Sequence, residues 1–561
     1  MQNNDICKGE MNQMPINHKN YFHFIMAILL TVFIFSIPGF SVAASGQTSG
    51  TTETQSDSAF IEMVQKACFD FFWNEANPQN GLIKDRDTGY SPCSIASVGF
   101  GLSAICIGID HGWITRAQGA ERVLTTLQTF WTKPQGRDAQ GFIGYKGFFY
   151  HFLDMNTATR VWNSELSSID TALLLAGILH AKGYFREEDD DEQMIRQLAD
   201  SIYYRVDWEW MRNFSPNITL GWHPESGFIN AWWNGYNEAM IMNILALGSP
   251  TYPVPKSTWN AWTSGYSWQT HYGYAYVNFP PLFGHQYSHC WIDFRNIQDA
   301  YMKNKGITYF ENSRRATLAQ RAYCIDNPGN FTGYSENIWG ITACDGPAPN
   351  YYIARGAPPA QNDDGTIAPT AAGGSIAFTP EESIAALRYM YDTYKSQIWK
   401  NYGFRDAFNL TKNWWGPDVI GIDQGAIILM MENYRTGNIW NIFMPNEDIQ
   451  RGLDRAGFEE ITSIGEEALW YVPESFQVFQ NYPNPFNAMT TITFYLPVRA
   501  HVSLKIYDHL GRKIELLEEG GREAGEHRLN FHSRRLASGV YYYTLTVDRN
   551  HSITRKMIVL N

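Results

Sequence analysis

The sequence lacks the short motifs by which proteins commonly hold nucleotides, metals or reactive thiols. It has no Walker loop, no H-E-x-x-H pair, no G-x-G-x-x-G after a strand and no G-x-S-x-G elbow. None of its seven cysteines is spaced as C-x-x-C, the spacing typical of zinc and redox sites. These absences argue against nucleotide-dependent, metal, redox and serine-hydrolase chemistry.

An excess of positive charge is also absent. The 561 residues include 43 Lys and Arg against 56 Asp and Glu, which gives a formal net charge of −13. Such a chain has no general attraction for nucleic acid or for an anionic membrane surface, so we expect no nucleic-acid partner. The length suits two to four domains.

Long apolar runs are missing except near the start of the chain. His18 and Lys19 precede an apolar run at 22–37, which small residues follow. The run is shorter than the about 20 residues of a membrane helix, so we predict a secretory signal peptide at 1–44. An uncleaved anchor is the alternative. The small polar residues of 45–58 predict a flexible linker.

A signal peptide implies an exported protein that is secreted or held at the cell surface. Export permits disulfides, but the sequence does not pair the cysteines, and buried free thiols are an equal alternative. Six cysteines follow the predicted signal peptide: Cys68, Cys93, Cys106, Cys290, Cys324 and Cys344.

The region 59–460 is predicted to be mainly helical. Apolar residues recur with helical periodicity in six segments, 60–73, 120–131, 171–180, 191–204, 239–247 and 381–394. Long loops rich in Gly, Pro, Trp and Tyr lie between them, as at 249–287 and 344–378, and such loops on a helical scaffold usually carry function. This pattern suits a barrel of helical hairpins, which we take as one catalytic domain.

The chain changes character after about residue 470, where the period becomes that of β-strands. Apolar and polar residues alternate in three segments, 491–496, 502–507 and 539–547. We therefore predict a linker at 461–479 and a small β-sandwich at 480–561.

The tail also contains four short segments and a glycine that together form a recognisable pattern. They are 481–487 (NYPNPFN), 491–494 (TITF), 506–508 (IYD), Gly511 and 536–542 (LASGVYY). In these segments, the tail resembles the type IX secretion C-terminal sorting domain. The resemblance implies an immunoglobulin-like β-sandwich that the type IX secretion machinery reads at the outer membrane. A generic immunoglobulin-like module is the alternative.

Carboxylates in aromatic, Gly-rich surroundings are the strongest candidates for chemistry, because glycoside hydrolysis needs a pair of them. Each candidate also has a structural interpretation as a helix-capping or first-turn acid. The candidates are Glu165, Asp170, Glu238, Glu336 and Asp423.

Three of these acids, Asp170, Glu238 and Asp423, stand where apolar helical segments begin. In a barrel of helical hairpins the inner helices all start at one end, so we expect these carboxylates to converge on one pocket. A helix N-terminus lowers the pKa of a carboxylate, and we expect Asp423 to stay ionised. Burial beside aromatic rings would instead raise the pKa of Glu238.

Aromatic residues make up 15% of the chain, which suits either large cores or the stacking of sugar rings. Trp232, Trp233 and Tyr236 stand close to Glu238 and predict a sugar subsite. We expect Trp291 to line the same cleft and Glu336 to contact substrate.

Seven segments of the helical region, taken in order, form a second pattern. They are 94–101 (SIASVGFG), 148–153 (FFYHFL), 165–175, 233–247, 285–295 (HQYSHCWIDFR), 368–375 (APTAAGGS) and 421–425 (GIDQG). Here the region resembles the glucoamylase-like glycoside hydrolases that include bacterial endo-β-1,2-glucanases. The resemblance implies an (α/α)6 barrel that hydrolyses β-1,2-linked glucan without a cofactor, and its acids carry over to Glu165, Asp170, Glu238 and Asp423.

Our mechanistic hypothesis is inversion, with Glu238 as general acid and Asp423 as the leading base. Glu165, Asp170 and Glu336 would bind substrate, or one of them would replace Asp423. Exo versus endo action stays open. Two alternatives remain. A polysaccharide lyase on a similar helical barrel would require a basic cleft. A non-catalytic glycan-binding surface protein would have lost the acids.

Overall fold

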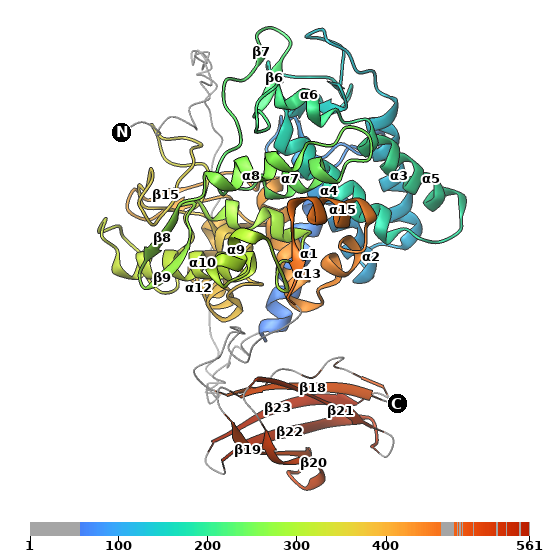
Figure 1. Cartoon of the computed structure of the whole chain (residues 1–561). Helices are drawn as coiled ribbons and strands as arrows, with labels where there is room; N and C mark the ends of the chain where they lie inside the picture. The colour runs from blue at the N-terminus through green and yellow to red at the C-terminus, as the bar shows by residue number, and fades with distance from the viewer. Residues whose placement is uncertain are drawn as a thin grey trace, which may run out of the picture. The chain divides into compact units, whose positions relative to one another are not determined.

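The computed structural model describes two stretches of the chain, residues 56–461 and most of 476–559 (Figure 1). Contacts divide the chain after Ile461 into two compact units. Three predicted segments lie wholly or mostly outside the described residues: the signal peptide 1–44 and the linkers 45–58 and 461–479.

Helices dominate the larger unit, and the structure confirms all six predicted helical segments. These are α1 (Asp57–Asn74), α3 (Arg116–Thr132), α4 (Ser168–Tyr184), α5 (Asp190–Tyr204), α7 (Met240–Gly248) and α12 (Pro380–Ile398). The apolar helical segment predicted to begin at Asp423 is α13 (Gly421–Arg435), while the main helices that were not predicted are α2 (Ile95–Asp110), α10 (Tyr309–Asp326) and α15 (Glu447–Ala456). The predicted loops also contain short elements: α8 (Lys256–Ser264), β8 (Trp268–His271), β9 (Tyr274–Val277) and α11 (Pro369–Gly373).

The helices α2, α4, α7 and α13 are buried on nearly every face and form the interior of the larger unit. α2 packs against α4 and α13, and α4 also packs against α7. Amphipathic helices such as α3 and α5 lie outside them, because each has one apolar face to bury. The described strands of this unit form two- and three-stranded antiparallel sheets, so its described part has no central parallel sheet.

Short strand pairs hold the starts of two inner helices. β1 (Cys93–Ser94) directly precedes α2 and pairs with β4 (Phe152–Leu153). β5 (Leu166–Ser167) directly precedes α4 and pairs with β6 (Gly221–His223), which forms a hairpin with β7 (Gly227–Phe228; Figure 1). Because each pair joins distant parts of the chain, the positions of these helix starts are fixed by tertiary structure.

Two glycines let α2 and α4 approach each other closely. A Cβ added to Gly177 would lie 1.9 Å from the carbonyl oxygen of Gly99, and one added to Gly99 would lie 2.2 Å from the carbonyl oxygen of Leu173. No side chain fits at these distances unless a backbone moves. The glycines therefore set the spacing of the two helices.

The smaller unit consists of two antiparallel sheets that share one hydrophobic core. One sheet has the order β17 (Gln477–Val478), β18 (Met489–Leu496), β21 (Gly525–His532). The other has the order β20 (Lys513–Arg522), β19 (Ala500–Asp508), β22 (Gly539–Val547), β23 (His551–Val559). The three predicted strands are confirmed as β18, β19 and β22, while the immunoglobulin-like assignment stays a prediction.

All six described cysteines are buried and free. The structure therefore shows the free-thiol alternative rather than disulfides. Burial raises the pKa of the Cys68 and Cys290 thiols, which keeps them in the unreactive protonated form.

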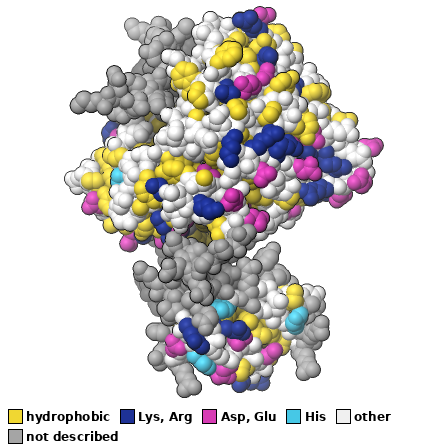
Figure 2. All heavy atoms as spheres, viewed as in Figure 1, with side chains coloured by type: hydrophobic (Ala, Val, Ile, Leu, Met, Phe, Trp, Pro, Cys, Tyr) yellow, Lys and Arg dark blue, Asp and Glu magenta, His cyan; other side chains and the backbone are white. Residues whose placement is uncertain are grey.

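The surface of the larger unit carries mixed charge on the face that Figure 2 shows. Lys and Arg side chains lie there among Asp and Glu side chains. Among the described residues, no helix combines the length and the apolar character that crossing a bilayer requires.

Candidate active site

Three of the predicted acids lie where inner helices start. Asp170 is in the first turn of α4, Asp423 is in the first turn of α13, and Glu238 is in the turn just before α7. Ser167 caps α4, because its Oγ accepts a hydrogen bond from the backbone N–H of Asp170 at 3.1 Å. The same Oγ donates to Asp170 Oδ2 at 2.5 Å, so Asp170 does take part in capping the helix.

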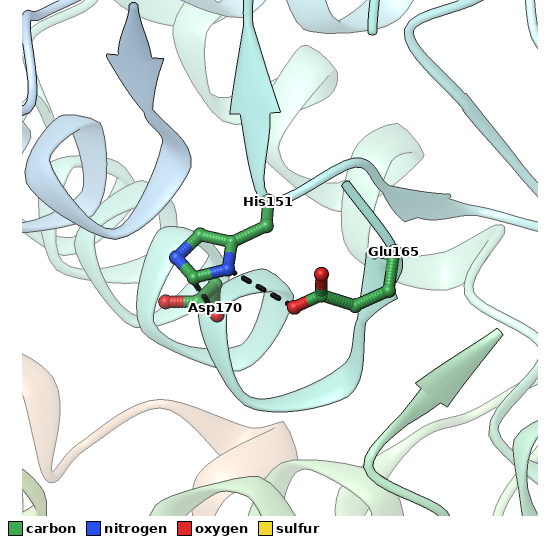
Figure 3. Close-up of side chains that lie close together, drawn as sticks. All are labelled: His151, Glu165 and Asp170. Carbon is green, nitrogen blue, oxygen red and sulfur yellow. Dashed lines mark hydrogen bonds and ion pairs between the residues drawn. The ribbon is translucent and has the colours of Figure 1, made fainter. Parts of the chain in front are cut away.

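His151 joins two of the acids into one cluster (Figure 3). Its Nδ1 lies 3.0 Å from Glu165 Oε1, and its Nε2 lies 3.6 Å from Asp170 Oδ2. Burial opposes the charged imidazole, yet Asp170 and Glu165 raise the pKa of His151 to about 9. Burial likewise opposes the charged Glu165, but His151 lowers the pKa of that carboxyl to about 2. His151 and Glu165 therefore form an ion pair at neutral pH.

Glu238 has the electrostatic setting of a general acid. Burial, assisted by repulsion from Asp170, raises the pKa of its carboxyl to about 7. Its Oε2 is buried and has no hydrogen-bond partner among the described residues. The backbone carbonyl of Glu238 accepts a hydrogen bond from Ser288 Oγ at 3.0 Å, which fixes the turn. The expected upward shift of the pKa is confirmed.

Asp423 departs from expectation, because its pKa is raised rather than lowered. The carboxyl is buried, and repulsion from Asp406 and Asp345 adds to the effect of burial. Arg86 offsets this only in part. Its guanidinium is shared among three other acids, at 3.0 Å from Asp85 and Asp345 and at 3.2 Å from Asp418. The prediction that the helix start keeps Asp423 ionised is therefore wrong.

Electrostatic interactions connect the predicted acids across one region of the larger unit. Asp170 acts on Glu238, and Asp85 acts on Asp170. Tyr287 interacts with both Glu238 and Asp423. The structure thus brings Glu165, Asp170, Glu238 and Asp423 to the end of the unit where the inner helices start.

Two of the four aromatic residues predicted to line the cleft are buried in the core, and the lining by the other two stays a prediction. Trp232 and Trp233 are half-buried, and Trp233 Nε1 donates to Ser168 Oγ at 2.9 Å, in the same helix turn as Asp170. Trp291 is 0% exposed and donates from Nε1 to Ser103 Oγ at 2.9 Å. Tyr236 is also buried, within a cluster of aromatic rings. Trp291 and Tyr236 are core residues, because no face of either ring is open to a sugar.

Glu336 is exposed and stands apart from the acids. Its backbone carbonyl accepts a hydrogen bond from Arg321 Nε at 3.0 Å. Among the described residues, no hydrogen bond or ion pair connects its side chain to the cluster of acids. Its predicted contact with substrate gains no support from this geometry.

Sequence reasoning did not assign a role to four residues that shape the site: Arg86, His151, Asp345 and Asp406. Asp406 Oδ2 accepts a hydrogen bond from the backbone N–H of Asp345 at 2.7 Å. His151 lies in the segment 148–153, which carried part of the family resemblance, and this was the one available signal. Asp345 and Asp406 lie in loops without a motif, and only the fold brings them to Asp423.

Two groups of side chains have the geometry to hold a metal ion. The ligand atoms of His151, Glu165 and Asp170 all lie within 4.8 Å of one another, as do those of a group on the outer surface, Glu187, Asp189 and Glu192. His151 is already ion-paired with Glu165, and Arg116 is ion-paired with Glu187 and Glu192. Because a cationic side chain already pairs with carboxylates in each group, we assign no metal to either.

Comparison with known proteins identifies both units. Residues 230–447 match the family model described as "Putative glucoamylase", and residues 480–560 match the secretion system C-terminal sorting domain. The sorting domain indicates secretion or export to the cell surface.

Among relatives, an exo β-1,2-glucooligosaccharide sophorohydrolase (non-reducing end) from Parabacteroides distasonis is 34% identical over 445 residues. The match covers 73% of this chain and 59% of that relative, so the chain spans less than two thirds of its length.

Two solved structures are similar throughout the larger unit. An endo-β-1,2-glucanase from Chitinophaga pinensis is 30% identical, with a TM-score of 0.66, over 72% of this chain and 99% of that one. A β-1,2-glucanase from Parabacteroides distasonis is 32% identical, with a TM-score of 0.65, over 72% of this chain and 60% of that one. On this likeness, the chain belongs to the glucoamylase-like family of glycoside hydrolases.

Proposed function

We propose that this chain is an exported hydrolase of β-1,2-linked glucan that acts by acid/base catalysis. One observation carries the proposal: burial among carboxylates raises the pKa of Glu238 to about 7, on a framework similar to that of β-1,2-glucan hydrolases. A glycosidase needs such a protonated acid to protonate the leaving oxygen. Trp232 and Trp233 are half-buried, and Trp233 contacts Ser168 in the first turn of the helix that carries Asp170.

The catalytic assignments follow from the pKa of each acid. Glu238 donates the proton, and Asp423 is the leading base in an inverting reaction. Because the pKa of Asp423 is raised, it works as a base only when its proton has moved to Asp406 or to solvent. Glu165, ionised by His151, binds sugar hydroxyls, and Asp170 raises the pKa of the acid. Either of them would replace Asp423 if the base lies on the other side of the cleft.

We propose that the inner helices form the ring of an (α/α)6 barrel. In support, α2 contacts α4, α4 contacts α7, and α7 contacts η2 (Tyr287–Cys290). Both η2 and α11 contact α13, and α13 in turn packs against α2. Such a ring would start all its inner helices at one end, where the acids lie.

The surroundings of the acids favour hydrolysis over the lyase alternative. A lyase acting on an acidic sugar needs free cations, but Arg86 and His151 are both engaged by carboxylates. A non-catalytic binding protein would not need a buried, protonated Glu238.

Release of reducing sugar from a panel of glucans tests this function. We expect hydrolysis of β-1,2-glucan, with little release from β-1,3-, β-1,4- and α-linked glucans. NMR of the first product should show inverted anomeric configuration. Activity confined to another linkage would contradict the proposed substrate, and a retained configuration would contradict the proposed mechanism.

A further inference from the structure

Trp162 is a large aromatic side chain that the fold leaves in solvent. It is 60% exposed. Its φ is 57°, and that of the next residue, Asn163, is 63°. These left-handed conformations are costly for residues with a Cβ, and they persist only where the surrounding structure imposes them. The fold thus holds an exposed Trp in a costly conformation.

Contacts on both sides of Trp162 make its loop rigid. Arg160 is buried, with its side chain only 3% exposed, and its Nε donates to the carbonyl oxygen of Ser164 at 2.6 Å. Its Nη1 is ion-paired with Glu225 Oε1 at 2.6 Å, which connects the loop to the turn between β6 and β7. The backbone N–H of Val161 donates to the carbonyl oxygen of Phe152 at 3.2 Å. The exposure of Trp162 is therefore not a sign of a loose segment.

A row of three aromatic rings in contact leads from Trp162 to the acids. The rings of Trp162 and Phe152 have centroids 5.3 Å apart. The His151 ring stacks on Phe152, with centroids 4.0 Å apart and an interplanar angle of 13°. His151 in turn contacts Glu165 and Asp170 (Figure 3). The rings of Phe152 and His151 thus connect Trp162 to Glu165 and Asp170.

We propose that Trp162 is a glucan-binding subsite, where its ring stacks on a glucose unit remote from the bond that is cleaved. The apolar C–H face of a pyranose fits an aromatic ring face, and a ring fixed in advance binds with little loss of entropy. The half-exposed carboxylate of Glu225 lies on the same rigid loop system and accepts hydrogen bonds from sugar hydroxyls. This subsite rests on the proposed function, since it requires a glucan that extends from the acids to Trp162.

A subsite distant from the cleaved bond affects long substrates more than short ones. We therefore compare Trp162→Ala with the wild type on long β-1,2-glucan and on the shortest oligosaccharide that the enzyme hydrolyses. The ratio of kcat/KM for the long substrate to that for the short one should fall about tenfold, as the loss of one stacked ring implies. Trp162→Phe, which keeps a ring, should recover most of the ratio.

The matched control is Tyr389→Ala, which removes another exposed aromatic ring, 42% exposed, from the outer helix α12. We expect this control to leave the ratio unchanged. Equal losses on both substrates in Trp162→Ala would indicate a merely structural role and overturn the subsite, as would an unchanged ratio.

A binding measurement separates failure of the subsite from failure of the proposed function. Calorimetry of Glu238→Gln with and without Trp162→Ala, using long β-1,2-glucan as the ligand, should show about tenfold weaker binding in the double variant. Equal binding would overturn the subsite while leaving the proposed function intact. If the wild type neither cleaves nor binds β-1,2-glucan, the proposed function fails, and the subsite fails with it.

Discussion

At the scale of single residues, His151 keeps the neighbouring Glu165 ionised. The pKa of His151 is raised from 6.5 to about 9 in the folded protein, so its contribution to stability is complete below pH 6.5 and is lost as pH rises through about 9. The pKa of Glu165 is lowered from 4.5 to about 2, so its contribution is complete above pH 4.5 and is lost as pH falls through about 2. The ion pair is therefore fully effective between pH 4.5 and 6.5.

The variant His151→Gln tests this pH window. We expect the free energy of unfolding to drop by about 1.5–3 kcal/mol at pH 5–6, a range typical of hydrogen bonds to charged groups. The difference between wild type and variant should shrink toward pH 9 and toward pH 2. Urea denaturation across this range measures it, and a difference that does not depend on pH would contradict the assigned ion pair.

The acids also show how far single residues could be predicted from sequence. The raised pKa of Glu238 was predicted from its apolar sequence surroundings, and burial does raise it. The raised pKa of Asp423 was not, because Asp345 and Asp406 reach it only through the fold. The local effect of the helix start was outweighed by burial and by acids from distant loops. Trp291 was misassigned for a related reason, since sequence does not reveal which aromatic rings enter the core.

At the scale of elements, the outer helices α3 and α5 were predictable from the sequence. α3 and α5 have one apolar face, and this produces helical periodicity in the sequence. α2 was missed because it is buried on nearly every face, so its apolar residues follow no period. Of the inner helices, α4 and α7 were detected from the sequence although they are also buried, whereas α2 was not.

The close contact of α2 with α4 yields a prediction about stability. Gly177→Ala places a Cβ 1.9 Å from the Gly99 carbonyl oxygen, so the helices must separate. We expect a loss of about 1–3 kcal/mol or more, as overpacking usually costs, measured by thermal denaturation. The control is Gly89→Ala, since nothing lies within 4 Å of a Cβ at that position. Equal stability of the two variants would show that the helix spacing is not set by Gly177.

At the scale of the whole molecule, the two units are predicted to have separate tasks. The larger unit has its own hydrophobic core and carries the acids, and the smaller unit matches a sorting domain. Deleting 480–561 should leave the larger unit folded and active but retained in the periplasm of its host. Fractionation of cells, with an activity assay on each fraction, measures this. Delivery of the truncated protein to the surface or medium at the normal level would contradict the sorting role.

The central claim is that Glu238 is the general acid of a β-1,2-glucan hydrolase. Its glutamine variant keeps the shape of the side chain but removes the proton that the mechanism requires. The most direct test is the rate of reducing-sugar release from β-1,2-glucan by Glu238→Gln relative to wild type, with thermal stability as the check on folding. We predict a fall of about 10²–10⁴-fold in a folded protein. A variant that retains most of the wild-type rate would contradict the account.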